Sequence, residues 1–447
     1  MASAAEQLAS NLNFAAFSKA TDLKKRIWFT LGALIVYRLG TYIPMPGINP
    51  DELARAFEQQ STGILGLFNM FAGGAVGRMA IFALGIMPYI SASIIIQLMT
   101  SVVPSLEALK KEGEQGRKVI NQYTRYGTVI LATVQAYGIS AGLETQGSIV
   151  VDPGLFFRIS SVITLVGGTM FLMWLGEQIT ARGIGNGISL IIFTGIVANL
   201  PAALAQLLEL GRTGALSTTV ILLVMVVAVV CIAGIVFFER AQRRLLIQYP
   251  KRQVGNRMFQ GDTSHLPLKL NTAGVIPPIF ASSLLLLPVT IANFTDTTQL
   301  PGWASAIITA LGHGQPLYMA LYALMIGFFA FFYTAVVFNP KETADNLKKH
   351  GGFIPGIRPG ERTAEYIDYV LTRITVVGAI YLVIICLLPE FLISAVGIPF
   401  YLGGTSLLIV VSVTMDTVAQ VQGHLLAHQY EGLVKKAKLR GGRRGGR

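Results

Sequence analysis

Long apolar stretches alternate with shorter polar connections along the chain, and ten of these stretches approach the length of a membrane-spanning helix, about 20 residues. A helix of that length can cross the hydrocarbon core with all its backbone groups paired. The expected spans run roughly over residues 27–42, 78–103, 123–143, 156–179, 186–208, 218–238, 271–292, 316–338, 374–396 and 401–424. The pattern therefore predicts an all-α polytopic membrane protein with ten transmembrane helices.

One further apolar stretch, Ile64 to Val76, is too short to cross a membrane and contains Gly66, Gly73 and Gly74. Such a length is typical of a re-entrant or interfacial segment. Irregular backbone at membrane depth is tolerated only where protein or a watery cavity surrounds it. We therefore expect a cavity beside this segment.

An internal repeat relates the second expected span to the seventh. Gly85 to Ser93 and Gly274 to Ser282 agree at five of nine positions, including the glycine, the proline and the final serine. Each span is the second of a five-span half, and five is odd, so the two halves would have opposite topology. Glycine- or proline-interrupted helices at matching places of two inverted repeats indicate a central pair. The alternative is that the Gly-x-x-Pro pattern kinks two unrelated membrane helices.

Basic residues fall mostly on one set of alternate connections. These connections, together with both chain ends, carry most of the 35 Lys and Arg residues, whereas the exceptions are Arg38, inside the first span, and Arg55, Arg78, Arg158 and Arg212 on the other side. Because basic loops stay in the cytoplasm, we expect both termini to be cytoplasmic and an even number of spans.

Composition agrees with a membrane protein and offers little chemistry. Hydrophobic residues make up 53% of the chain and charged residues only 13%, and the mean hydropathy is +0.59. Cys231 and Cys386 both lie in apolar stretches, so no disulfide framework or cysteine-based metal site is expected. We expect no cofactor, no metal and no enzymatic activity.

The expected central helices hold no charge in their middles, whereas a coupled transporter usually displays acids or bases there. Asp416 in the tenth span is the clearest acid within a span, and it is either a proton carrier or a polar contact between helices. An ion-coupled transporter therefore competes with a passive conduit closed by an apolar constriction.

Two polar connections on the basic side are unusually long, over residues 240–270 and 340–373. Loops of this length often have a function, so they are either a docking surface for a cytosolic partner or simply basic loops that fix topology. The glycine- and arginine-rich end, Lys435 to Arg447, is typical of a solvated, disordered cytoplasmic tail.

Six motifs, in order along the chain, resemble the SecY family of bacterial protein-conducting channels. They are Phe82 to Ile90, Gly176 to Thr180, Arg182 to Gly187, Thr263 to Lys269, Phe338 to Asn346 and Gly356 to Glu361. The resemblance implies two inverted five-helix halves around a central hourglass pore, with a short re-entrant plug helix. It also implies transport of unfolded preproteins across the inner membrane and lateral release of apolar segments into the lipid.

The resemblance implies partners as well. SecE would brace the halves, SecG would lie at the side, and the SecA motor or a translating ribosome would dock on the cytoplasmic loops. Signal peptides and preproteins would be the substrates. The expected organisation is an N-terminal half over residues 1–208 with the plug at about 64–76, a C-terminal half over 209–424, and a basic tail over 425–447.

Site residues follow from the resemblance by position. The constricting ring would consist of Ile86, Ile90, Ile188, Ile192, Ile279 and Ile409, and the plug would include Ile64, Leu65, Leu67, Phe68, Asn69 and Phe71. The polar residues of the lateral gate would be Gln97, Thr128 and Asn271, and the docking residues Arg244, Lys251, Arg252, Arg257 and Arg358. Asn256 departs from the family, which often has a basic residue there, and this weakens the expected ribosome contact of that loop tip.

The charge distribution makes a testable prediction of topology. Reporter domains fused in connections of the basic-poor side should appear on the outer side of the membrane, and those fused in connections of the basic side should stay on the inner side. The outside positions are Thr145, Gly214, Thr298 and Ser394, and the inside positions are Gly113, Gly255 and Gly351. Reversed reporters at any two positions would overturn the ten-span arrangement.

Overall fold

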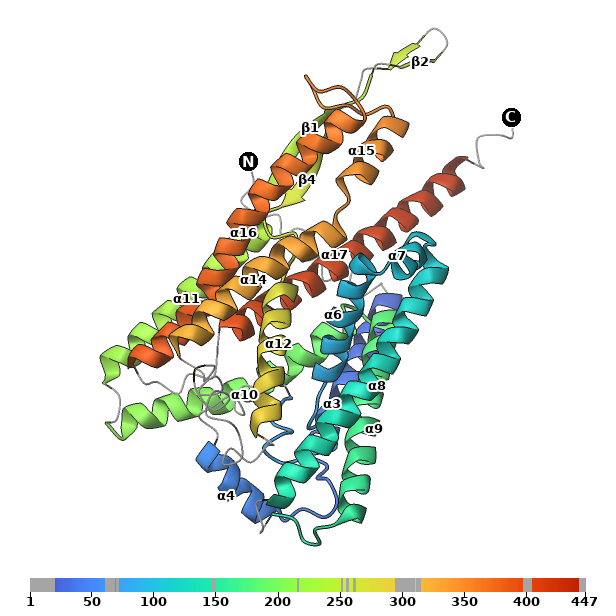
Figure 1. Cartoon of the computed structure of the whole chain (residues 1–447). Helices are drawn as coiled ribbons and strands as arrows, with labels where there is room; N and C mark the ends of the chain where they lie inside the picture. Colours follow the sequence, from blue (N-terminus) through green and yellow to red (C-terminus); the bar gives the residue numbers. More distant parts are fainter. Residues whose placement is uncertain are drawn as a thin grey trace. The chain divides into compact units, whose positions relative to one another are not determined.

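The computed structural model describes residues 21–60, 69, 72–145, 149–214, 217–250, 252–254, 257–259, 263–293, 310, 315–396 and 404–441. Most of these residues are helical (Figure 1). The helices are α3 (Thr21–Gly40), α4 (Pro50–Gln60), α6 (Met87–Val102), α7 (Pro104–Lys111), α8 (Glu114–Thr145), α9 (Leu155–Arg182), α10 (Gly187–Arg212), α11 (Thr218–Arg240), α12 (Ile276–Asn293), α14 (Pro316–Val337), α15 (Pro340–Lys349), α16 (Glu361–Val396) and α17 (Gly404–Gly441). Four short strands are β1 (Gln242–Gln248), β2 (Arg252–Val254), β3 (Arg257–Phe259) and β4 (Thr263–Lys269).

Each of the ten expected spans coincides with a helix. Among the described residues, α9, α10, α11, α14, α16 and α17 are long and apolar enough to cross a membrane by themselves. The pair α6 and α7 passes the same test together but bends by 97° at Val103, where Pro104 begins the second helix. The remaining expected spans correspond to α3, α8 and α12.

The contacts divide the chain into two compact units. Unit 1 comprises Met1–Pro201 and Val413–Arg447, and unit 2 comprises Ala202–Ser412. In unit 1, α8 packs against both α6 and α9, and α9 also contacts α3. In unit 2, α14 lies between α12 and α16, and α16 also contacts α11 and α15. Pro201, which removes one backbone hydrogen bond inside α10, lies at the boundary.

The internal repeat is visible in the backbone. Gly85 and Gly274 both adopt positive φ angles, +57° and +63°, and a helix begins two residues after each of them. The prolines Pro88 and Pro277 occupy the second helical position, where the missing N–H has no partner to lose. The second span was expected from Arg78, but its helix begins at Met87, because the chain turns through the left-handed region at Gly85.

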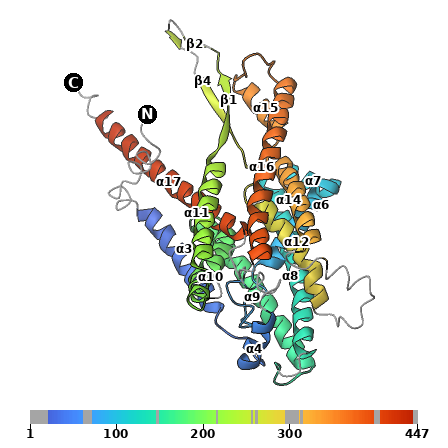
Figure 2. The same ribbon diagram turned by 90° about the vertical axis from the view of Figure 1, so that its left-hand side faces the viewer.

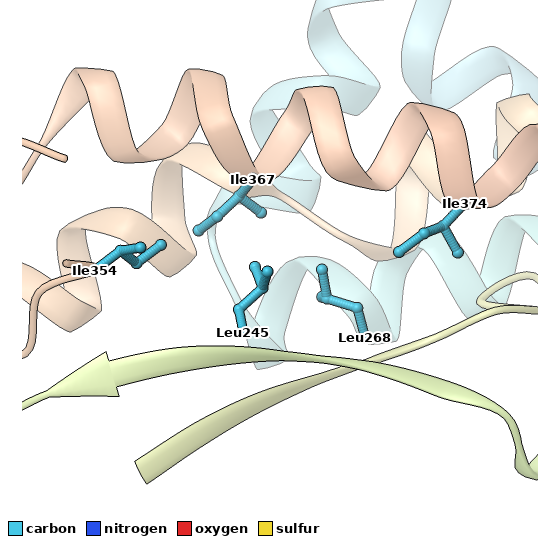
Figure 3. Packing of buried hydrophobic residues seen from close by; sticks show 5 residues of the cluster. All are labelled: Leu245, Leu268, Ile354, Ile367 and Ile374. Atoms are coloured by element: carbon cyan, nitrogen blue, oxygen red, sulfur yellow. The ribbon is translucent and has the colours of Figure 1, made fainter. Parts of the chain in front are cut away.

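The connection over residues 240–270 contains strands that the all-α prediction did not include. β1 pairs with β4 as an antiparallel ladder, and β2 pairs with β3 (Figure 2). Every second residue of β1 from Leu245 is buried, so the ladder has an apolar face. Figure 3 shows Leu245 and Leu268 pointing from the strands toward Ile367 and Ile374 of α16, with Ile354 beside them. This core fixes the ladder to the start of α16.

Two other expectations are corrected at the ends of helices. Much of the connection over residues 340–373 is helical, because it holds α15 and the first turns of α16. Asn339 caps α15 by accepting from the N–H groups of Lys341 and Glu342. The disordered tail was expected from Lys435, but α17 continues to Gly441. Lys, Leu and Ala favour a helix here, and the repeated glycines follow only afterwards.

Candidate functional site

The first pair of expected ring residues lies where α6 begins. Ile86 is the residue before the helix, and its carbonyl accepts from the Ile90 N–H at 3.1 Å. Both side chains are buried, with exposed fractions of 4% and 6%. Residues Ile86 to Ile90 therefore form the first hydrogen-bonded turn of α6. The positive φ of Gly85 sets where this helix starts.

The second pair lies in α10, directly after the corner between α9 and α10. Ile188 is half-buried and Ile192 is buried. The corner is held by Thr180, whose hydroxyl donates to the Gly176 carbonyl at 2.9 Å and accepts from the Gly187 N–H at 2.9 Å. A Cβ on Gly187 would overlap that same carbonyl. Thr180 thus sets where α10 starts, and with it the position of both isoleucines within unit 1.

The remaining expected ring residues lie in unit 2. Ile279 is half-buried in the first turn of α12, and its carbonyl accepts from the hydroxyls of Ser282 and Ser283. Ile409, in the part of α17 that belongs to unit 2, is 1% exposed. A hydrogen bond of 2.7 Å between the hydroxyls of Tyr322 and Thr405 links α14 to the start of α17. Each expected ring residue thus lies on a helix or, for Ile86, directly before one.

Most of the expected plug lies outside the described residues. These positions are Ile64, Leu65, Leu67, Phe68 and Phe71. Asn69 is described, and it is the residue that joins this region to the chain that follows: its backbone carbonyl accepts from the Gly74 N–H at 2.7 Å, and its side-chain oxygen accepts from the Gly77 N–H at 2.8 Å.

The expected gate residues differ in how their polar atoms are used. Thr128 is fully buried on α8, and its hydroxyl donates to the Thr124 carbonyl of the same helix at 2.8 Å. The side-chain oxygen of Gln97 is buried without a hydrogen-bond partner among the described residues. Burying an unpaired oxygen costs free energy. Gln97, unlike Thr128, therefore retains an acceptor that could bind another group.

Asn271 has a partner that the sequence analysis missed. Its amide donates to the Glu239 carboxylate at 2.7 Å and to the Gly274 carbonyl at 3.1 Å. Glu239 lies in the last turn of α11, so the pair connects the end of that helix to the turn that starts α12. The signal available in the sequence was an acid at the end of an apolar span, which usually has a specific partner.

Two of the expected docking residues lie on one platform in unit 2. Arg244 on β1 and Arg358 in the connection between α15 and α16 are both exposed. Gln248 and Phe353 join these elements by two backbone hydrogen bonds of 2.9 Å and 3.0 Å, and the core of Figure 3 lies beneath them. Arg252 and Arg257 begin β2 and β3, and Lys251 lies outside the described residues.

Metal ions in proteins are bound by groups of His, Cys, Asp and Glu side chains. Within the described ranges, no group of three or more His, Cys, Asp or Glu residues could hold a metal ion. Cys231 and Cys386 are both buried and form no disulfide within the described part of the chain. Asp416, the acid that the transporter hypothesis depends on, is exposed on α17.

Comparison with known proteins identifies the family. The family model of SecY matches residues 80–418, which covers most of the chain. The chain belongs to the SecY family. A protein translocase subunit SecY of Pseudomonas aeruginosa is 58% identical over 422 residues, which cover 94% of this chain and 95% of that protein. The SecY of Escherichia coli K12 is also 58% identical, over 424 residues, or 94% and 96% of the two chains.

Solved structures agree with the fold. A structure described as a protein conducting channel superposes with a TM-score of 0.67 at 18% identity, covering 90% of this chain and 92% of that one. Sec61 from the canine ribosome-channel complex superposes with a TM-score of 0.64 at 17% identity and covers the same shares. The SecY-like fold and the apolar helices together establish a multi-pass membrane protein.

The Thr180 corner leads to a prediction about stability. Thr180→Val keeps the shape of the side chain but removes the hydrogen bond from the Gly187 N–H that joins α10 to α9, together with the bond to Gly176 within α9, so it should lower the free energy of unfolding by about 1 kcal/mol. Reversible unfolding of the purified protein in mixed micelles measures the change. Thr180→Ser retains the hydroxyl and serves as the control. Equal stability of the valine variant and the wild type would show that the corner is fixed by the close approach of the glycines alone.

Proposed function

We propose that this chain is the central subunit of a protein translocation channel, through which unfolded preproteins cross the inner membrane and from which apolar segments leave sideways into the lipid. The observation that carries the proposal is the identity of 58% to SecY proteins over nearly the full length of both chains. The absence of charge in the middles of α6 and α12 supports a conduit with no coupling chemistry of its own.

The proposed seal is a ring of isoleucines that each unit contributes from its own helices. Ile86, Ile90, Ile188 and Ile192 belong to unit 1, and Ile279 and Ile409 belong to unit 2. A narrow neck of branched aliphatic side chains excludes water and therefore ions, yet it has no fixed polar contacts that would bind a passing polypeptide. The segment over residues 64–76 is proposed to stop the neck from the outer side, and Gln97, Thr128 and Asn271 to lie along the lateral exit.

Energy for transport is proposed to come from partners. The family supports SecE and SecG as companion subunits, and SecA or a translating ribosome as the driving partner. Their proposed docking surface is the platform of Arg244 and Arg358, with Lys251, Arg252 and Arg257 at its tip. Arginine suits this role because its planar fork pairs with both carboxylates and phosphates. Both termini and this platform are proposed to face the cytoplasm. The proposed halves comprise residues 1–208 and 209–424, and the basic tail comprises residues 425–447.

The experiment that tests the function is reconstitution. The purified chain, with its companion subunits and an ATP-driven cytosolic motor, should move an unfolded preprotein into lipid vesicles and protect it from added protease. Omission of ATP is the control. Uptake of a small solute coupled to an ion gradient, without transport of the preprotein, would instead support the secondary transporter.

A second test addresses the seal. Replacing Ile86, Ile192 or Ile279 with serine should wet the neck and raise the resting ion conductance of single channels in planar bilayers several-fold, whereas leucine at the same positions should not. Deleting Leu65 to Phe71 should also produce leak.

The matched control for the seal is Leu222→Ser. Leu222 lies on α11 and is 63% exposed, as expected for a side chain that faces lipid. Its replacement should leave the conductance unchanged. Ring variants that are as tight as the wild type, with no crosslink between Ile86 or Ile279 and a trapped preprotein, would remove these residues from the path.

A further inference from the structure

Arg38 is a charged residue inside the first span, and none of the roles described above uses it. A guanidinium within a membrane helix is costly, and it usually marks a functional position with a specific partner. Arg38 lies in the last turn of α3 and is half-buried. Among the described residues it forms no ion pair with a carboxylate, and its hydrogen-bond partners there are neutral acceptors.

The partner of Arg38 is the segment that leads into α6. We call residues 72–86 the glycine segment. One Arg38 nitrogen, Nη1, donates to the Gly73 carbonyl at 2.6 Å and also approaches the Thr41 hydroxyl at 3.4 Å. The other, Nη2, donates to the Tyr42 hydroxyl at 3.3 Å. The contact to Gly73 is the shortest of the three, as is typical of a well-formed hydrogen bond from a charged donor.

The backbone conformation and close packing of Gly73 bring its carbonyl within hydrogen-bond distance of Arg38. Gly73 has a φ of +67°, and a Cβ there would lie 2.8 Å from the Tyr37 hydroxyl and 3.2 Å from the Cα of Gly195 on α10. The backbone therefore passes closely between α3 and α10, with its carbonyl turned toward Arg38. Any side chain at this position would push the segment away from both helices.

Arg78 repeats the arrangement one residue later. Its Nε donates to the Gly74 carbonyl at 3.3 Å. The guanidinium carbons of Arg78 and Arg38 lie 4.0 Å and 5.3 Å from the centre of the Tyr42 ring. Two arginines thus donate to consecutive carbonyls, and the electron-rich ring of Tyr42, which lies near both guanidinium groups, offsets their repulsion.

The rest of the glycine segment is buried and ends at a proposed ring residue. Ala72, Ala75 and Ala80 are at most 3% exposed, and the last residue of the segment is Ile86. A shift at Gly73 would therefore be passed to the start of α6 through closely packed backbone rather than absorbed by a loose loop.

We propose that Arg38 is a positioning residue that holds the glycine segment, and with it Ile86, against α3 and α10 through the Gly73 carbonyl. The relevance of this contact to sealing rests on the proposed function, whereas the contact itself does not. The competing role for an arginine at the end of a membrane helix is a contact with a lipid phosphate, and the test below distinguishes the two.

The test measures how often the glycine segment opens. Ala72→Cys is introduced into the full chain, reconstituted with its companion subunits in lipid nanodiscs, and its reaction with a soluble maleimide is followed by mass spectrometry of the peptide that contains it. Peptide analysis separates this thiol from the buried Cys231 and Cys386. Arg38→Gln should accelerate the reaction at least about tenfold, because a hydrogen bond from a charged donor is lost, and Arg38→Lys should give an intermediate rate.

Three controls separate a local effect of Arg38 on the glycine segment from a lipid contact and from a general loss of fold. Tyr42→Phe removes the 3.3 Å hydrogen bond to Arg38 and the hydroxyl's interaction with Arg78 but keeps the ring and the Arg38–Gly73 contact, and Arg55→Gln removes an exposed arginine of α4, so neither should change the rate. A cysteine at Ala136, which is fully buried on α8, should stay protected in the Arg38→Gln variant. An unchanged rate at Ala72→Cys would favour the lipid contact, and equal acceleration at Ala136→Cys would show a general loss of fold; either result overturns the proposal.

A parallel recording separates this proposal from the function. If the chain is a channel, Arg38→Gln should also raise the resting conductance in planar bilayers. Faster thiol reaction without any conductance would retain the positioning role of Arg38 and reject the channel. Conductance that rises while the thiol stays protected would reject the positioning role.

Discussion

The pairing of backbone polar groups is the constraint on which the rest of this structure depends. In hydrocarbon an unpaired N–H or C=O costs several kcal/mol, on the order of the whole stability of many domains. Helices solve this problem by themselves, but the glycine segment is not helical and needs partners from outside. From outside the segment, Asn69 accepts from Gly74 and Gly77, Arg38 donates to Gly73, and residues 43–45 pair with the segment's later residues; within the segment, Arg78 donates to Gly74. A non-helical segment near the proposed pore is possible only because these donors and acceptors pair its backbone groups.

The two halves meet this constraint in the same way at the start of their central helices. Gly85 and Gly274 turn the chain through positive φ, and the helices begin with a proline in the first turn. In unit 2 the turn is held by Asn271, which bonds the Gly274 carbonyl and Glu239. Equivalent local chemistry thus produces equivalent helix starts, which explains why the match between Gly85–Ser93 and Gly274–Ser282 survives at the residues that set backbone geometry.

The positions of the spans could be predicted because a membrane helix requires a long run of apolar residues, and all ten expected spans coincide with helices. Their ends could not. The start of α6 at Met87 depends on the φ of Gly85, and the ladder of β1 and β4 depends on a core supplied by Ile367 and Ile374 about 100 residues later. The partners of Arg38 and Glu239 were missed for the same reason, since a hydrogen bond across 32 or 35 residues leaves no periodic pattern in the sequence. Assignment of the ring isoleucines required the family resemblance, because composition does not separate a pore-lining isoleucine from one that packs in lipid.

The polar side chains described here are used mainly to build the scaffold, and this bears on the choice between a conduit and a coupled transporter. Thr180 closes the corner between α9 and α10, Arg38 holds the glycine segment, and Asn271 and Glu239 fix the start of α12. The hydroxyls of Thr128 and Ser283 donate to carbonyls of their own helices. A transporter that couples two solutes must leave polar groups free to bind them at the midplane, whereas a passage for chains of every sequence is served best by walls that bind none of them. These polar groups are committed to the framework, although the buried side-chain oxygen of Gln97 has no such partner among the described residues. Together with the proposed isoleucine ring, they meet the second requirement.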